Sequence, residues 1–242
     1  MNVIVLKAEM RADAKKHKLT VPRVTWKSKV WGLGARTLAW RVSGRYGKAT
    51  TDRLKLWGHF HPLSFGQLVA RVAKAKVGVH ERGSSNTGKF VDIFLKAVYL
   101  PGGYAWCAAF AIWDVIRTAI INDVLDDTTN DYEKLRDIMH DLFFGNAAYV
   151  PNLARAFREG RKAHGWRAVG VSWPNVQAGD IIICYGGGHV EVSTGPMHGG
   201  RVPTIGGNTS TSGSQDNGGE VCIKSRAVGS EATSAGRIIP PR

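Results

Sequence analysis

The chain has 242 residues, of which 43% are apolar, with 29 glycines and 9 prolines. This composition is typical of a globular, loop-rich protein with one large domain or two modest ones, and it argues against intrinsic disorder. No stretch approaches 18 uninterrupted apolar residues, and residues 1–16 lack an apolar run long enough for a signal peptide. We therefore expect synthesis in a cytoplasm without a leader.

The net charge of +14 is concentrated in the N-terminal third. Residues 1–77 contain 17 Lys and Arg against 3 Asp and Glu, whereas residues 78–242 contain 16 of each sign. Charge distributed in this way predicts a segment that approaches an anionic surface, namely nucleic acid, anionic lipid or a bacterial wall polymer. The alternative is a solvated basic arm that only aids solubility.

The N-terminal third divides into two predicted parts. Residues 1–25 are polar and basic without clear periodicity, which indicates an arm or linker. Helical patterns follow, and the strongest covers residues 64–77, with Ser64 as a candidate N-cap. We predict a small, mostly helical module over residues 26–77.

From residue 78 the composition changes, and a loop at 78–90 leads into four predicted helices. They are separated by glycine and proline breaks, of which Pro101-Gly102-Gly103 is the clearest. The second helix carries apolar side chains at helical spacing, which marks it as largely buried. The predicted helices cover residues 91–100, 105–124, about 129–145 with Thr129 or Asn130 as cap, and a stretch starting after Pro151.

After Trp173-Pro174 the pattern changes from helical to strand-like. Four short apolar or alternating runs, separated by glycine-rich turns, predict an antiparallel meander. These runs cover residues 180–188, 189–195, 201–207 and 220–228. Helices first and strands afterwards indicate an α+β fold with segregated helices rather than alternating βαβ units.

Three cysteines are too few and too scattered for a disulfide framework or a four-ligand zinc site. Cys184 and Cys222 can pair if their strands are neighbours, although a reducing compartment disfavours this. Cys107 then remains as the free thiol, in the first turn of the predicted helix 105–124. It is either a small packed core residue or a nucleophile.

A thiol reacts as its thiolate, which the positive end of a helix dipole and a nearby imidazolium both favour. His189 is the best placed base among the eight histidines, because it begins a strand directly after three glycines. A base needs an orienting partner, and Asn208 and Glu191 are the candidates. Glu191 shares a face with His189, but side chains two apart on a strand run parallel, so we favour Asn208 at the end of the next strand. The order Cys, His, Asn is that of a papain-like thiol hydrolase.

Several blocks carry a resemblance to a known family. "GVHERGSSNTGKF", "YAWCAAFAIWDV", "AGDIIICYGGGHVEVSTG" and "TIGGNTS", followed by "GGEVCIKSR" and "RIIPPR", resemble successive signature blocks of CHAP domains (cysteine, histidine-dependent amidohydrolase/peptidase) from phage endolysins. The resemblance covers residues 78–242 and implies a papain-like fold of the NlpC/P60 superfamily, with its N-terminal helices packed on an antiparallel sheet. It implies that Cys107 is the nucleophile, His189 the base and Asn208 the third member.

Two positions depart from the family pattern. Many members carry an acid two positions before the Asn, where this chain has Gly206, and a small or apolar residue two positions after the His, where this chain has Glu191. The usual acid is therefore missing, and Asn208 or Glu191 must orient the base. No aspartate-rich loop precedes Cys107, so we expect neither a metal nor another cofactor.

The substrate groove is predicted at the loop and turn near Cys107. We expect Ser85, Asn86 and Trp106 to line it, with a core position as the alternative for Trp106. Residues 30–58 faintly resemble a degenerate three-helix peptidoglycan-binding module. A basic targeting segment is the alternative, and both serve wall attachment.

The sequence thus predicts a monomeric endolysin-type hydrolase whose partners are peptidoglycan and anionic wall polymers. It cleaves either the amide between muramic acid and L-Ala or one in the stem or cross-bridge peptide. We expect it to reach the wall after holin-dependent release from the host cytoplasm or as part of a virion. One rival is an inactive wall-binding or virion structural protein with the same fold. The other is a nucleic-acid binder, against which the few aromatics among the basic residues argue.

Overall fold

The computed structural model describes residues 63–83, 85–121, 129–211 and 218–241. The chain divides into two compact units, Met1–His61 and Pro62–Arg242, and all described residues belong to the second. The predicted basic arm and most of the predicted N-terminal module lie outside the described residues.

The described part of the chain contains five α-helices, each of which overlaps a predicted one. They are α4 (Phe65–Lys74), α5 (Lys89–Lys96), α6 (Cys107–Ile121), α7 (Thr129–Leu142) and α8 (Val150–Glu159). Ser64 caps α4 as predicted, through a reciprocal capping box with Gln67. Helix α8 begins one residue before Pro151, whose missing N–H is tolerated in a first turn.

Seven strands form one antiparallel sheet in the order β1-β2-β7-β3-β4-β5-β6. Their bounds are β1 (Lys162–Ala163), β2 (Trp166–Val171), β3 (Ile181–Cys184), β4 (His189–Ser193), β5 (Arg201–Thr209), β6 (Glu220–Ala227) and β7 (Ala232–Ile239). The predicted meander is confirmed for β3 to β6, and the α+β class is confirmed with it. Strands β1, β2 and β7 were not predicted, and β7 inserts between β2 and β3.

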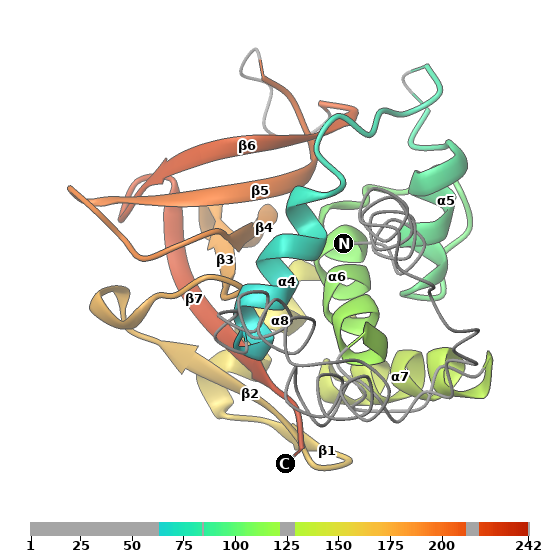
Figure 1. Ribbon diagram of the computed structural model, residues 1–242, viewed down its shortest axis with the longest axis horizontal. Coiled ribbons are helices and arrows are strands. Elements are labelled where there is room, and N and C mark those ends of the chain that lie inside the picture. Colours follow the sequence, from blue (N-terminus) through green and yellow to red (C-terminus); the bar gives the residue numbers. More distant parts are fainter. Residues whose placement is uncertain (1–62, 84, 122–128, 212–217, 242) are drawn as a thin grey trace, which may run out of the picture. The chain divides into compact units, whose positions relative to one another are not determined.

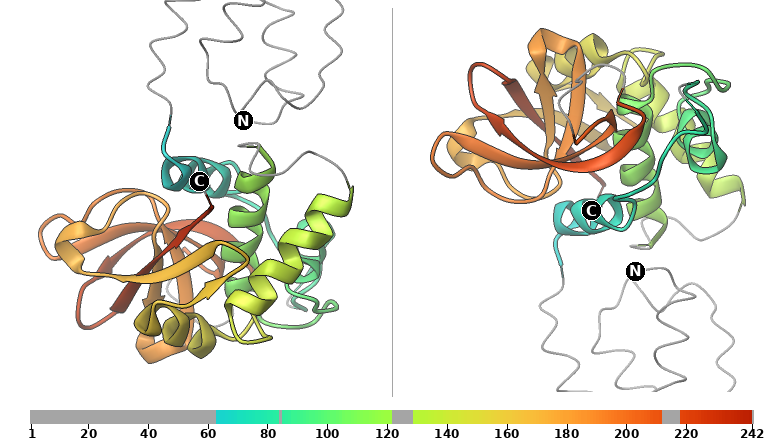
Figure 2. Two further views of the ribbon diagram at one scale, coloured as in Figure 1. Left: turned by 90° about the horizontal axis from the view of Figure 1, so that it is seen from below. Right: turned by 90° about the horizontal axis from the view of Figure 1, so that it is seen from above.

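The strands gather on one side of this unit and helices α5, α6 and α7 on the other, with α4 running beside α6 (Figure 1). Two further views show the same separation of helices and sheet (Figure 2). Residues 107–116 of α6 are all buried, which explains why apolar side chains lie on more than one face of that helix. None of the described helices has the length and apolar character needed to cross a membrane.

The main core lies between α6 and the sheet, where Phe110 and Ile112 join Val190 and Val192 of β4. Three residues of α4, namely Val69, Val72 and Ala73, belong to the same core. This helix was assigned to the N-terminal module by sequence, but it packs as part of the unit Pro62–Arg242.

Candidate active site

Cys107 lies at the free N-terminal end of α6. The Phe110 N–H donates to the Trp106 carbonyl at 2.9 Å, so Trp106 precedes the first helical turn. The N–H groups of residues 107–109 therefore have no acceptor within the helix, and they lie at the positive end of its dipole. The Cys107 residue is only 6% exposed. A negative charge that develops beside it meets backbone donors and little water.

The turn before Cys107 is held by Glu81, a residue that the sequence analysis did not single out. Trp106 Nε1 donates to Glu81 Oε1 at 2.7 Å, and the Asn86 N–H donates to Glu81 Oε2 at 3.0 Å. The Gly103 N–H in turn donates to the Asn86 carbonyl at 2.9 Å. One carboxylate thus ties the 81–88 loop to the start of α6.

The predicted groove residues have different environments. Trp106 has no exposed surface, so it lies in the core beneath the site, as the alternative interpretation held. Ser85 is exposed, and its hydroxyl contacts the Arg82 carbonyl and the Thr87 hydroxyl. Asn86 is half-buried, and its Oδ1 has no hydrogen-bond partner among the described residues. That oxygen is itself buried, so neither Asn86 nor Trp106 presents this predicted contact at the surface.

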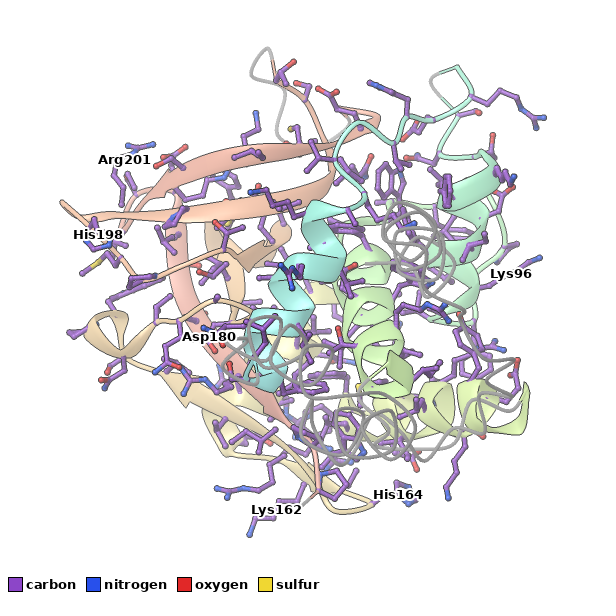
Figure 3. The ribbon with its side chains drawn as sticks, viewed as in Figure 1. Lys96, Lys162, His164, Asp180, His198 and Arg201 are labelled. Carbon is purple, nitrogen blue, oxygen red and sulfur yellow. The ribbon has the colours of Figure 1, made fainter. Side chains whose placement is uncertain are left out.

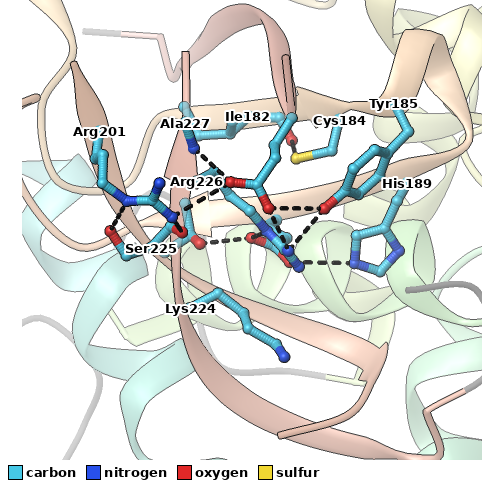
Figure 4. A network of polar contacts seen from close by, with 12 residues as sticks. Ile182, Cys184, Tyr185, His189, Arg201, Lys224, Ser225, Arg226 and Ala227 are labelled. Atoms are coloured by element: carbon cyan, nitrogen blue, oxygen red, sulfur yellow. Dashed lines mark hydrogen bonds and ion pairs between the residues drawn. The ribbon is translucent and has the colours of Figure 1, made fainter. Parts of the chain in front are cut away.

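His189 lies between the thiol and a carboxylate. It is the first residue of β4, opposite Cys184 on β3, and is 1% exposed. The Cys107 thiol is close enough to the ring to raise its pKa. Its Nε2 lies 3.3 Å from Glu191 Oε1, a close ion pair rather than an aligned hydrogen bond (Figure 4). The contact with Glu191 leaves Nδ1 as the ring nitrogen available to the sulfur.

The surroundings of His189 favour its protonated form. Burial alone lowers its pKa, because a buried charge loses hydration. The proximity of Cys107 and Glu191 acts in the opposite direction and raises the pKa to about 9. At neutral pH the ring therefore carries a proton that it can donate.

Glu191 is fully buried, and its carboxylate is held on several sides. Arg226 Nε donates to Oε2 at 2.9 Å, Arg226 Nη2 donates to Oε1, and the Thr204 hydroxyl donates to Oε2. Burial raises the pKa of this carboxyl, but His189 and Arg226 outweigh burial and hold it at about 2. Glu191 is thus ionised throughout the neutral range.

Gly206 provides the space that Glu191 occupies. A Cβ built at Gly206 would lie 2.8 Å from Glu191 Oε1 and 2.9 Å from its Cγ. The two departures from the family pattern are therefore neighbours in space: β5 lacks a side chain where β4 places its acid. The site does contain a buried carboxylate, which comes from the adjacent strand.

Asn208 makes no hydrogen bond or ion pair with His189 in the described part of the chain. It is 2% exposed, has a φ of 54° and lies where the β5–β6 register shifts. The β4–β5 register ends at Val192↔Ile205, and its continuation by three residues would set Asn208 opposite His189. Its Oδ1 has no hydrogen-bond partner among the described residues. The partner in contact with His189 is thus Glu191, which was the second choice from sequence. A role for Asn208 stays a prediction.

The other two cysteines are buried thiols with no role in the candidate site. Cys184 and Cys222 are free and buried, and they lie on β3 and β6, which β4 and β5 separate. They cannot form the disulfide considered from sequence, because their strands are not neighbours. Burial raises the pKa of both thiols. Within the described ranges no group of three or more His, Cys, Asp or Glu is placed to hold a metal ion.

Comparisons with known proteins give no further assignment. No protein-family model matches the chain, and neither a curated protein nor a solved structure matches it. The interpretation of the site therefore depends on its own geometry.

Proposed function

We propose that residues 62–242 form a papain-like thiol hydrolase that cleaves an amide bond of bacterial peptidoglycan. Cys107 is the nucleophile, His189 the general acid and base, and Glu191 the residue that orients His189. The observation that carries the proposal is the placement of Cys107 at the free end of α6, beside a buried His189 ring whose Nε2 lies 3.3 Å from the buried Glu191 carboxylate.

In the first half of the reaction the Cys107 thiolate attacks the amide carbon, and the carbonyl electron pair moves onto oxygen. The unpaired N–H groups at the start of α6 stabilise this oxyanion. When the adduct collapses, the C–N bond breaks and His189 gives its proton to the leaving nitrogen. A thioester on Cys107 remains.

In the second half water attacks the thioester carbon while neutral His189 removes a proton from it. The C–S bond then breaks, the thiolate returns, and the acid product leaves. Glu191 keeps its negative charge throughout and stabilises the imidazolium, because its pKa is about 2.

The substrate class is inferred from two features of the sequence. Residues 78–242 resemble CHAP domains, which act on peptidoglycan, and residues 1–77 carry a large basic excess that suits an anionic wall polymer. The new ends that the reaction releases will distinguish cleavage at the muramic acid amide from cleavage within the peptide.

The test measures clearing of a peptidoglycan suspension, with mass analysis of the new ends. We expect Cys107→Ser to lower the rate of clearing by about 10³-fold or more, because no base at this site is strong enough to ionise a serine hydroxyl. Cys222→Ala is the matched control, since it removes another buried thiol, and it should retain clearing. Equal clearing by Cys107→Ser and the unchanged protein would instead favour a wall-binding or virion structural protein.

A further inference from the structure

A buried arginine lies directly behind the proposed site. Arg226 comes from β6 and is 2% exposed. Burying a guanidinium costs several kcal/mol unless opposite charges and hydrogen bonds compensate, so such a residue requires a specific set of partners.

The main partner of Arg226 is Glu191. Two N–H groups of one guanidinium meet the two oxygens of one carboxylate, Nε to Oε2 and Nη2 to Oε1. This two-point contact fixes the plane of the carboxylate as well as its position. The oxygen that accepts from Nη2 is the same Oε1 that lies 3.3 Å from His189 Nε2. The direction in which Glu191 faces His189 is thus set by Arg226.

The third nitrogen of the guanidinium is occupied as well. Arg226 Nη1 donates to the Tyr185 hydroxyl at 2.8 Å and lies 3.5 Å from Glu231 Oε1. Glu231 Oε2 lies 3.3 Å from Arg201 Nη2, which is half exposed. Figure 3 shows Arg201 near the tip of the β5–β6 pair, and Figure 4 shows the network from Arg201 to His189.

Charges alternate from His189 outward along a line of side chains that begins at Cys107. From the buried sulfur outward, the order is Cys107, His189, Glu191, Arg226, Glu231 and Arg201. Each buried charge therefore has an opposite charge next to it. Without Arg226, the carboxylate of Glu191 would keep only His189 and the Thr204 hydroxyl as described partners in a site closed to water.

Other groups beside Glu191 cannot take over this role. Cys184 and Cys222 lie within its electrostatic reach, but burial raises the pKa of each thiol and both stay neutral. The Lys224 ammonium, from the same strand as Arg226, donates to the Ser210 carbonyl. Apart from His189 itself, Arg226 is the cation that contacts Glu191 among the described residues.

We infer that Arg226 is a positioning residue: it holds the Glu191 carboxylate against His189 and so keeps the Cys107–His189 pair assembled for reaction. The identity of the reaction rests on the function proposed above, but the inference concerns the reactivity of Cys107 itself and can be measured without a wall substrate. Its physical basis is that an ionised, oriented carboxylate stabilises the imidazolium, which in turn stabilises the thiolate.

The experiment uses the full chain and two measurements as a function of pH. One is clearing of peptidoglycan, and the other is the rate at which iodoacetamide alkylates Cys107, followed by peptide mass. The variants are Arg226→Met, Arg226→Lys, Glu191→Gln and the double variant of Arg226→Met with Glu191→Gln. Arg237→Met is the matched control, because Arg237 makes the same two-point contact with Asp180, at 2.7 and 2.8 Å, elsewhere on the sheet.

We expect Arg226→Met to slow clearing by about 10- to 100-fold. Losses of this size are usual when a residue that holds a functional side chain in place is removed. The rate of Cys107 alkylation at pH 7 should fall by about 10-fold, since Glu191 loses the cation that keeps it ionised and therefore stabilises protonated His189 less. Arg226→Lys should recover part of both effects. The double variant should be no slower than Glu191→Gln alone, because Arg226 acts through Glu191. Arg237→Met should lose stability but keep both pH profiles.

Additive losses in the double variant, or an unchanged rate of Cys107 alkylation in Arg226→Met, would overturn the inference. If Arg226→Met does not fold, Arg226→Lys answers the same question, since it keeps the charge but loses the fork. A protein that leaves walls intact while its rate of Cys107 alkylation depends on Arg226 would refute the proposed substrate and support the inference. A protein that clears walls while its rate of Cys107 alkylation is the same with and without Arg226 would support the proposed substrate and refute the inference.

Discussion

Gly206→Ala tests whether the space at this glycine is what allows Glu191 to orient His189. The added Cβ would lie 2.8 Å from Glu191 Oε1, 2.9 Å from Cγ and 3.1 Å from Cδ. Ordinary carbon contacts begin near 3.4 Å, so the carboxylate has to move by about half an ångström or more. Gly206 does not have a positive φ, and an alanine there carries no backbone strain.

Glu191 cannot yield freely, because Arg226 and Thr204 hold both of its oxygens. We expect the overpacking in Gly206→Ala to cost about 1–3 kcal/mol of unfolding free energy. The 3.3 Å contact between His189 and Glu191 should lengthen, and kcat for wall cleavage should fall by about 10-fold or more.

The assay combines denaturant unfolding with initial rates of peptidoglycan clearing. Gly195→Ala is the control, because its Cβ would lie 3.7 Å from Pro203 Cγ, an ordinary contact, and it should change neither quantity. Moving the acid to β5, with Gly206→Glu and Glu191→Ala together, should recover activity relative to Glu191→Ala alone. A Gly206→Ala protein with unchanged stability and unchanged kcat would refute the steric reasoning.

Two further predictions concern Glu191→Gln. In the unchanged protein, activity should decline on the alkaline side as His189 loses its proton near pH 9. Glu191→Gln should move this alkaline limb of the pH–rate profile down by about one unit, because it removes a charge that raises the pKa of His189. An unmoved limb would contradict this. The folded-state pKa of Glu191, about 2, lies below its ordinary 4.5, so its contribution to stability is present above pH 4.5 and is lost as pH falls through 2. Denaturant unfolding from pH 5 to 2 should therefore show a shallower loss in Glu191→Gln than in the unchanged protein.

The helices and the meander were predictable because their signals are local. Apolar spacing, the Ser64 cap and glycine-rich turns each depend on a few neighbouring residues. Strand β7 gave no such signal, since its sequence is rich in small and polar residues. Gly236 shows the reason: a Cβ there would overlap the Phe157 ring of α8. The small residue is set by packing against a helix some 80 positions away in the chain.

The candidate site divides in the same way. Cys107 and His189 could be found because a helix start and a run of glycines mark them. The contact between Glu191 and His189 depends on how β4, β5 and β6 pair, since Gly206 provides the room and Arg226 the anchor. The rule that side chains two apart on a strand run parallel does not hold for Glu191. Its side chain is long, and Arg226 holds its carboxylate beside His189. Glu81 was missed because an acid in a loop carries no periodic signal.

The place of β7 in the sheet has a consequence for biosynthesis. Strand Ala232–Ile239 fills the gap between β2 and β3, so during translation these two strands have no common partner until residue 239 has emerged from the ribosome. Until then each presents an open hydrogen-bonding edge to other chains. The partly synthesised chain therefore exposes two unpaired strand edges, and deletion of these eight residues removes an interior strand of the sheet.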